Sequence, residues 1–67
     1  MKPPPPSRLV LTRVLPPFRY YDVFEGDEYL GKVASNGPRS WTAFVDGRRP
    51  KFLSVAEAVE ALREVGS

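Results

Sequence analysis

The chain has 67 residues, a net charge of +2, no cysteine and no histidine. A chain of this length forms one small domain that buries only about 60% of its unfolded surface. Without cysteine it has no disulfides or thiolate metal sites, and without histidine it lacks the commonest metal ligand and general base. The sequence therefore predicts no metal and no cofactor, and it leaves self-association open as a source of further burial.

The first part of the chain is basic and rich in proline. Residues 1–19 carry four basic residues and no acid, whereas residues 20–67 carry six basic residues against eight acidic ones. The prolines at positions 3–6 fix φ and predict an extended, mobile polyproline II leader over residues 1–8, ahead of a single domain over residues 9–67. Such a leader can dock on an aromatic groove, although it more often serves as a stiff, soluble extension.

The sequence has no signal peptide and no apolar run long enough to span a membrane. We therefore expect a cytoplasmic protein with no membrane partner.

Four segments have the composition of β-strands. Residues 9–15 are apolar on both faces, which predicts a strand buried on both sides or paired with a second chain. Residues 20–25, 29–35 and 40–46 are separated by turn sequences that contain Gly26-Asp27 and Asn36-Gly37-Pro38. These three segments predict an antiparallel meander.

An amphipathic helix is predicted at the C-terminal end of the chain. Ser54 is a good N-cap, Glu57 completes a capping box, and Gly66 stands where a left-handed C-terminal cap belongs. The apolar residues of this segment recur at three- and four-residue spacing and form one stripe: Val55, Ala58, Val59, Leu62 and Val65. The predicted fold is α+β, an antiparallel sheet of three to four strands with one C-terminal helix on one face, in the order β-β-β-α with or without a further N-terminal strand.

Alternation along the strands assigns their side chains to two faces of the sheet. The face toward the helix is expected to carry Trp41, Ala43 and Val45 with Val33, Tyr21 and Val23, and Gly31 is expected to let the helix approach closely. The opposite face is expected to carry one apolar patch, formed by Tyr20, Phe24, Leu30 and Phe44.

Three interpretations of this patch stay open. Residues 9–15 fold over or beside it within the monomer, or it joins another protein or a second copy, or a one-residue slip of the strands exchanges the two faces.

The sequence gives no support for catalysis. Its carboxylates form no recognisable acid–base pair, its serines have no histidine to activate them, and no Gly-Lys-Ser/Thr phosphate loop is present. We therefore expect a protein that is not an enzyme and has no small-molecule substrate.

Residues 40–62 carry a pattern of core positions that includes Trp41, Ala43, Val45-Asp46-Gly47, Phe52 and Leu62. This pattern resembles the last strand and helix of the three-stranded-sheet-plus-helix DNA-binding domains, among them the plant AP2-type domains and the arm-binding domains of phage-type integrases. It is also similar to pieces of small phage and actinobacterial proteins of unknown function, which implies an accessory role. The resemblance implies a helix behind the sheet and a sheet face that enters the major groove. Members of the family present arginines and a tryptophan outward, so the implied DNA contact carries over only to Lys32.

Two functional hypotheses follow. The favoured one is a small adaptor or regulatory module that binds a protein partner, or a second copy of itself as a homodimer, through Tyr20, Phe24, Leu30 and Phe44. The alternative is a DNA- or RNA-binding accessory protein that uses basic residues of the sheet and loops: Arg13, Arg19, Lys32, Arg39, Arg48, Arg49 and Lys51.

Overall fold

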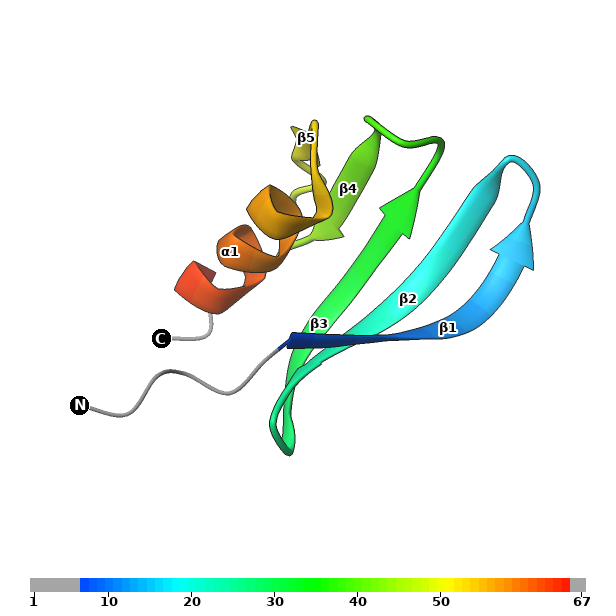
Figure 1. Cartoon of the computed structure of the whole chain (residues 1–67). Coiled ribbons are helices and arrows are strands. Elements are labelled where there is room, and N and C mark those ends of the chain that lie inside the picture. The colour runs from blue at the N-terminus through cyan, green and yellow to red at the C-terminus, as the bar shows by residue number, and fades with distance from the viewer. Residues whose placement is uncertain (1–6, 66–67) are drawn as a thin grey trace.

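A computed structural model describes residues 7–65, which form one antiparallel sheet and one helix (Figure 1). The strands follow their order in the sequence across the sheet, so the topology is a continuous meander. This confirms the predicted α+β fold with a further N-terminal strand, and it adds a fifth strand at the opposite edge. The elements are β1 (Ser7–Leu15), β2 (Phe18–Glu25), β3 (Glu28–Ser35), β4 (Trp41–Phe44), β5 (Lys51–Phe52) and α1 (Val55–Val65).

Glycines form the tight corners of the meander. Gly26 between β2 and β3 has a φ of 62°, and Gly47 after β4 has a φ of 70°, both in the left-handed region that glycine occupies without steric cost. Around Gly47, the backbone N–H of Val45 donates to the carbonyl of Arg48 at 3.1 Å. Asp46 and Gly47 therefore form a turn after β4, and the chain continues from it into β5, which pairs with β4.

The helix begins where the sequence places its cap. Ser54 Oγ accepts a hydrogen bond from the backbone N–H of Glu57 at 3.3 Å. The carboxylate of Glu57 accepts from the backbone N–H of Leu53 at 3.4 Å, one residue before the donor expected in a capping box. The predicted C-terminal cap at Gly66 lies outside the described residues.

The core lies between α1 and the centre of the sheet. Val23, Val33 and Ala43 are fully buried, and they pack against three buried residues of the helix: Ala58, Val59 and Leu62. The predicted helix-facing register of these strands is therefore correct. A Cβ built on Gly31 would lie 2.9 Å from Leu62 Cδ2, so the missing side chain allows the helix to approach β3.

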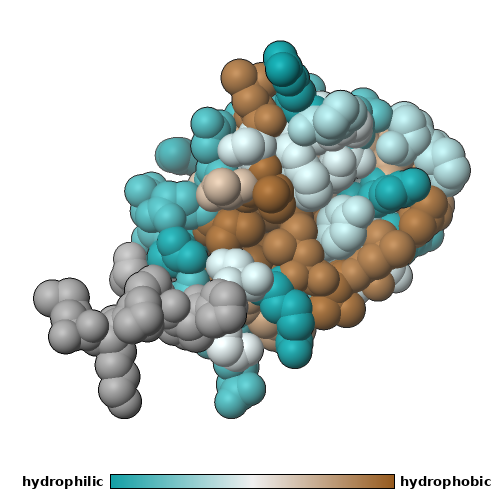
Figure 2. All heavy atoms as spheres, in the orientation of Figure 1, coloured by the Kyte–Doolittle hydropathy of each residue, from teal (hydrophilic) through white to brown (hydrophobic). Residues whose placement is uncertain are grey.

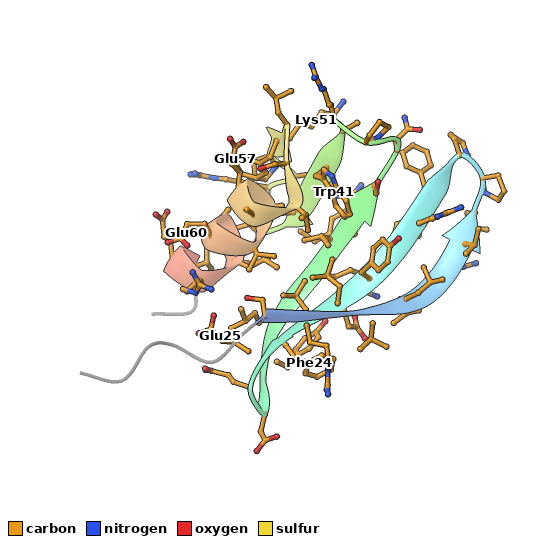
Figure 3. All side chains as sticks on the ribbon, viewed as in Figure 1. Phe24, Glu25, Trp41, Lys51, Glu57 and Glu60 are labelled. Carbon is orange, nitrogen blue, oxygen red and sulfur yellow. The ribbon has the colours of Figure 1, made fainter. Side chains whose placement is uncertain are left out.

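The helix covers only one half of the sheet. It packs against β3, β4 and β5, and the β1–β2 hairpin extends beyond it, which gives the molecule its elongated extents of 41 × 21 × 20 Å (Figure 1). Arg63 joins the two halves, because its Nε donates to Glu25 Oε2 at 2.8 Å and its Nη2 donates to Ser7 Oγ at 3.4 Å. The hydrogen bond to Glu25 raises the pKa of Arg63 above its ordinary value. Figure 3 shows Glu25 below the last turn of the helix.

β1 extends the sheet instead of covering either face. It pairs with β2 from Ser7, opposite Glu25, to Leu15, opposite Phe18. A β-bulge at Thr12 interrupts this register, and the Thr12 hydroxyl donates to the carbonyl of Tyr20 at 3.2 Å. Most of the apolar side chains of β1 stay half-exposed, so the alternative in which this segment buries the opposite face of the sheet does not hold for the described residues.

Among residues 7–65, no helix combines the length and apolar character that crossing a membrane requires.

Candidate nucleic-acid interface

The side of the sheet opposite α1, called the outer face below, carries a row of contacting aromatic rings. Tyr20 and Phe44 stack with ring centroids 6.1 Å apart and an interplanar angle of 21°. Phe18 adds to this pair, with its centroid 6.4 Å from that of Tyr20. Ala34, which pairs with Tyr20 in the sheet, is only 5% exposed beneath these rings. We call Phe18, Tyr20 and Phe44 the first ring cluster.

A second ring cluster lies at the other end of β2. Phe24 and Tyr29 are neighbours in the register of β2 and β3, and their ring centroids are 5.4 Å apart. Figure 3 shows Phe24 on the side of the sheet away from the helix. The sequence predicts Phe24 on this face but not Tyr29.

The predicted position of Leu30 on the outer face is wrong. A bulge in β3 makes Val23 pair with Gly31 and Phe24 pair with Tyr29, so Leu30 is an extra residue without a partner. Because a bulge breaks the alternation of side chains, Leu30 packs against the core cluster instead. Tyr29 consequently takes the place on the outer face that strict alternation assigns to Leu30.

Asp22 lies between the two ring clusters, next to one hydrogen-bond donor and one lysine. Its Oδ1 accepts a hydrogen bond from the hydroxyl of Tyr29 at 3.3 Å, and Lys32 lies opposite it in the register of β2 and β3. Partial burial, the negative charge of Asp22 and this hydrogen bond together raise the pKa of Tyr29. Repulsion of an anionic ligand by Asp22 is therefore reduced by a neighbouring cation and a hydrogen-bond donor.

Basic side chains flank both ring clusters. The guanidinium carbon of Arg8 lies 5.2 Å from the ring centroid of Phe24, and that of Arg49 lies 5.6 Å from the centroid of Phe44. Both distances fall in the range of cation–π contacts. Arg13 pairs with Tyr20 across β1 and β2, and Lys32 pairs with Phe44 across β3 and β4.

Several of the predicted basic residues are therefore brought together, and others are not. Arg13, Lys32 and Arg49 lie at the outer face, and Lys51 pairs with Thr42 at its β5 edge. Arg48 lines one hollow together with Phe44, Arg49 and the acidic Asp46, whereas Arg19 and Arg39 line hollows elsewhere on the surface.

Arg8 is the basic residue that sequence reasoning missed, because the predicted leader included it. The structure begins β1 two residues earlier than the predicted start at residue 9, and this places Arg8 opposite Phe24. The alternation of the strand, extended back by one residue from Leu9, assigns Arg8 to the outer face.

The opposite side of the molecule has a different charge. Glu57 and Glu60 project from α1 away from the sheet (Figure 3). Arg63 on the same helix is paired with Glu25 and Glu60. The outer face is thus aromatic and has more basic than acidic side chains, whereas the exposed side of the helix is mainly acidic.

Comparison of the chain with protein-family models, with curated proteins and with solved structures finds no match. The resemblance of residues 40–62 to sheet-plus-helix DNA-binding domains therefore stays a prediction.

Proposed function

We propose that the outer face binds single-stranded nucleic acid, with bases stacked on the two ring clusters and phosphates held by the surrounding basic side chains. The observation that supports this most directly is the pairing of rings with cations on a sheet face that residues 7–65 leave uncovered. Arg8 lies over Phe24 and Arg49 lies over Phe44. Aromatic platforms with a positive rim are the usual means by which proteins bind single strands without sequence preference.

Stacking provides the base contacts in this proposal. Every base has a π-face, and one base stacked on an aromatic side chain contributes about 1–3 kcal/mol. The first ring cluster offers a partly exposed surface with side chains from β2 and β4, and the second offers another at the end of the β2–β3 hairpin.

The width of the sheet favours a single strand over a duplex. The major groove is about 12 Å wide and admits a helix or a two-stranded ribbon. The four strands β1–β4, at about 4.8 Å spacing, span roughly 14 Å between their axes before side chains are added. All four strands contribute side chains to the outer face, so the face as a whole is too broad for that groove.

Docking of a protein on the same face is the competing hypothesis. That hypothesis depends on an apolar patch. Leu30, one of the four residues predicted for the patch, packs against the core instead. Three arginines lie at the same face beside the remaining rings: Arg8, Arg13 and Arg49. A surface with this many cations fits a polyanion better than it fits an apolar partner.

Salt dependence separates the two hypotheses. If Arg8, Arg13, Lys32 and Arg49 each contact one phosphate, binding to a single strand weakens by roughly 50-fold between about 50 and 200 mM salt. Fluorescence anisotropy with labelled oligo-dT and oligo-U measures this slope and compares DNA with RNA, and a duplex of the same length is expected to bind less tightly. Docking of an apolar protein partner would depend little on salt.

A matched pair of variants tests the position of the ligand. Arg13→Gln removes a cation of the outer face and is expected to reduce the slope of log affinity against log salt by about 0.7. Arg39→Gln removes the same charge from a loop away from the face and is expected to affect binding much less. Absence of binding at low salt, or equal losses in the two variants, contradicts the proposal.

A further inference from the structure

A hollow on the helix side of the sheet lies beyond the end of the helix-covered area. Tyr21 and Trp41 form one wall, with ring centroids 5.8 Å apart and an interplanar angle of 39°. Both rings pack against the core cluster along one edge and stay partly exposed along the other. Strand and loop residues complete the lining: Pro17, Arg19, Ser35, Gly37 and Pro38.

The hollow continues into an exposed apolar strip of β1. Leu11 pairs with Tyr21 and is 51% exposed, and Val14 pairs with Arg19 and is 50% exposed. Figure 2 shows hydrophobic surface running from the centre of the molecule along β1, and Figure 3 shows Trp41 between the helix and β3. The outer face carries the ring clusters of the proposed nucleic-acid site, so this hollow is a separate surface.

The lining has the chemistry that recognises polyproline II segments. Such segments dock in grooves walled by aromatic rings, because proline rings are apolar and the extended conformation is formed before binding. Proline has no N–H, so its backbone offers only carbonyl acceptors. The guanidinium of Arg19, the hydroxyl of Tyr21 and the indole N–H of Trp41 are donors of the kind that match those carbonyls.

The chain itself contains a run of prolines outside the described residues. Four consecutive prolines occupy positions 3–6, directly before β1 begins at Ser7. We propose that the Tyr21–Trp41 hollow binds the proline segment of a second copy of this chain.

The direction of β1 indicates that the proline segment in the hollow comes from a second copy and not from the same molecule. Ser7 lies opposite Glu25, whereas the hollow lies beside Tyr21 and Arg19, four to six residues or roughly 13–20 Å farther along β2. β1 runs from Ser7 toward the hollow, so a segment that precedes Ser7 has to reverse direction to reach the hollow of its own chain. Consecutive prolines disfavour that reversal, because each ring fixes φ and restricts the residue before it to extended conformations.

Trp41 is the single tryptophan of the chain and reports directly on the hollow. Raising the concentration of the full chain is expected to shift the emission of Trp41 to shorter wavelength, together with an increase in sedimentation coefficient. Reciprocal docking of two chains gives a closed dimer, and one-way docking gives open chains. Both products are visible by sedimentation and both support the proposal.

Variants of the proline segment leave the sequence of residues 7–65 unchanged. Pro4→Ala combined with Pro5→Ala is expected to weaken the association about tenfold or more, whereas the control Lys2→Ala removes a charge, keeps the prolines and is expected to associate like the parent. A peptide of residues 1–7 in excess is expected to shift the Trp41 emission and to dissociate the parent assembly. The same peptide with alanine in place of the prolines is expected to do neither.

A variant of the hollow completes the test. Tyr21→Ala is expected to weaken association about tenfold, the scale of an aromatic anchor in an interface. Circular dichroism verifies that this variant is folded, and Tyr29→Ala on the outer face is the matched control. The proposal is overturned if the parent stays monomeric and the proline peptide leaves Trp41 emission unchanged. It is overturned as well if the Pro4→Ala, Pro5→Ala variant associates as strongly as the parent.

Discussion

Two halves of one sheet, β3–β5 beneath the helix and the β1–β2 hairpin beyond it, use apolar residues in different ways. Under the helix, small residues such as Val33, Ala43 and Ala58 are completely buried. In the hairpin, Val23 of β2 reaches that core, but Leu11 and Val14 of β1 stay about half exposed, although β1 is paired with β2 along its length. Pairing of backbone groups therefore does not by itself bury side chains, and most of β1 lacks the burial that the helix supplies to the centre of the sheet.

A pair of leucine substitutions tests this contrast with the largest expected effect. Leu62→Ala removes a side chain that is 3% exposed, and it is expected to lower the free energy of unfolding by about 2–5 kcal/mol. Leu11→Ala makes the same chemical change in the hairpin and is expected to cost less than about 1 kcal/mol, because that site is already half exposed. Urea denaturation measures both values, and equal losses would show that the hairpin contributes as much to stability as the covered half.

A pair of glycine substitutions sharpens the comparison at the contact between helix and sheet. Gly31→Ala places a Cβ 2.9 Å from Leu62 Cδ2 and keeps a backbone φ of 149°, so it is expected to cost about 1–3 kcal/mol. Gly37→Ala has a similar backbone requirement, with a φ of 119°, but no atom lies within 4 Å of its added Cβ. The difference between the two melting temperatures isolates the steric part, and a Gly37→Ala variant that is the less stable of the two would contradict this account.

The smallest expected effect concerns the outer face at high pH. The pKa of Tyr29 is raised above its ordinary value of 10.0, so the folded state favours the neutral phenol. This contribution to stability is complete below the unfolded pKa and is lost as the pH rises through the folded pKa, above pH 10. Asp22→Asn removes the negative charge beside Tyr29 and is expected to bring its pKa part of the way back, since burial is the largest cause and remains. NMR titration of the tyrosine ring carbons measures the change, and an unchanged pKa would exclude an effect of Asp22.

Much of the fold follows from periodicity in the sequence. The three- and four-residue spacing of Ala58, Val59 and Leu62 locates the helix, and the alternation of Ala43 and Val33 assigns the helix-facing side of the sheet. β5 is not predicted because it has only two residues and follows a proline and two arginines, a composition typical of a loop.

The candidate site is predictable only in part, because it depends on irregularities. Tyr20, Phe24 and Phe44 follow the alternation and lie on the outer face, whereas the bulge in β3 exchanges Leu30 for Tyr29. A bulge adds one residue without a distinctive composition, and Gly31 is its only mark in the sequence. Arg8 lies on the outer face because β1 pairs with β2 as far as Ser7. This pairing depends on the tertiary fold and cannot be predicted from the strand propensity of residues 7 and 8.

The Thr12 bulge also limits how far this sheet can grow by adding strands from other molecules. A regular nine-residue edge strand with many apolar side chains would be a flat template for cross-β stacking in concentrated samples. The bulge twists the edge strand β1 locally, and Arg13 places a charge directly after the bulge. These two features divide the edge strand into short pieces, so we expect it to accept a strand from another molecule less readily than a regular nine-residue edge strand would.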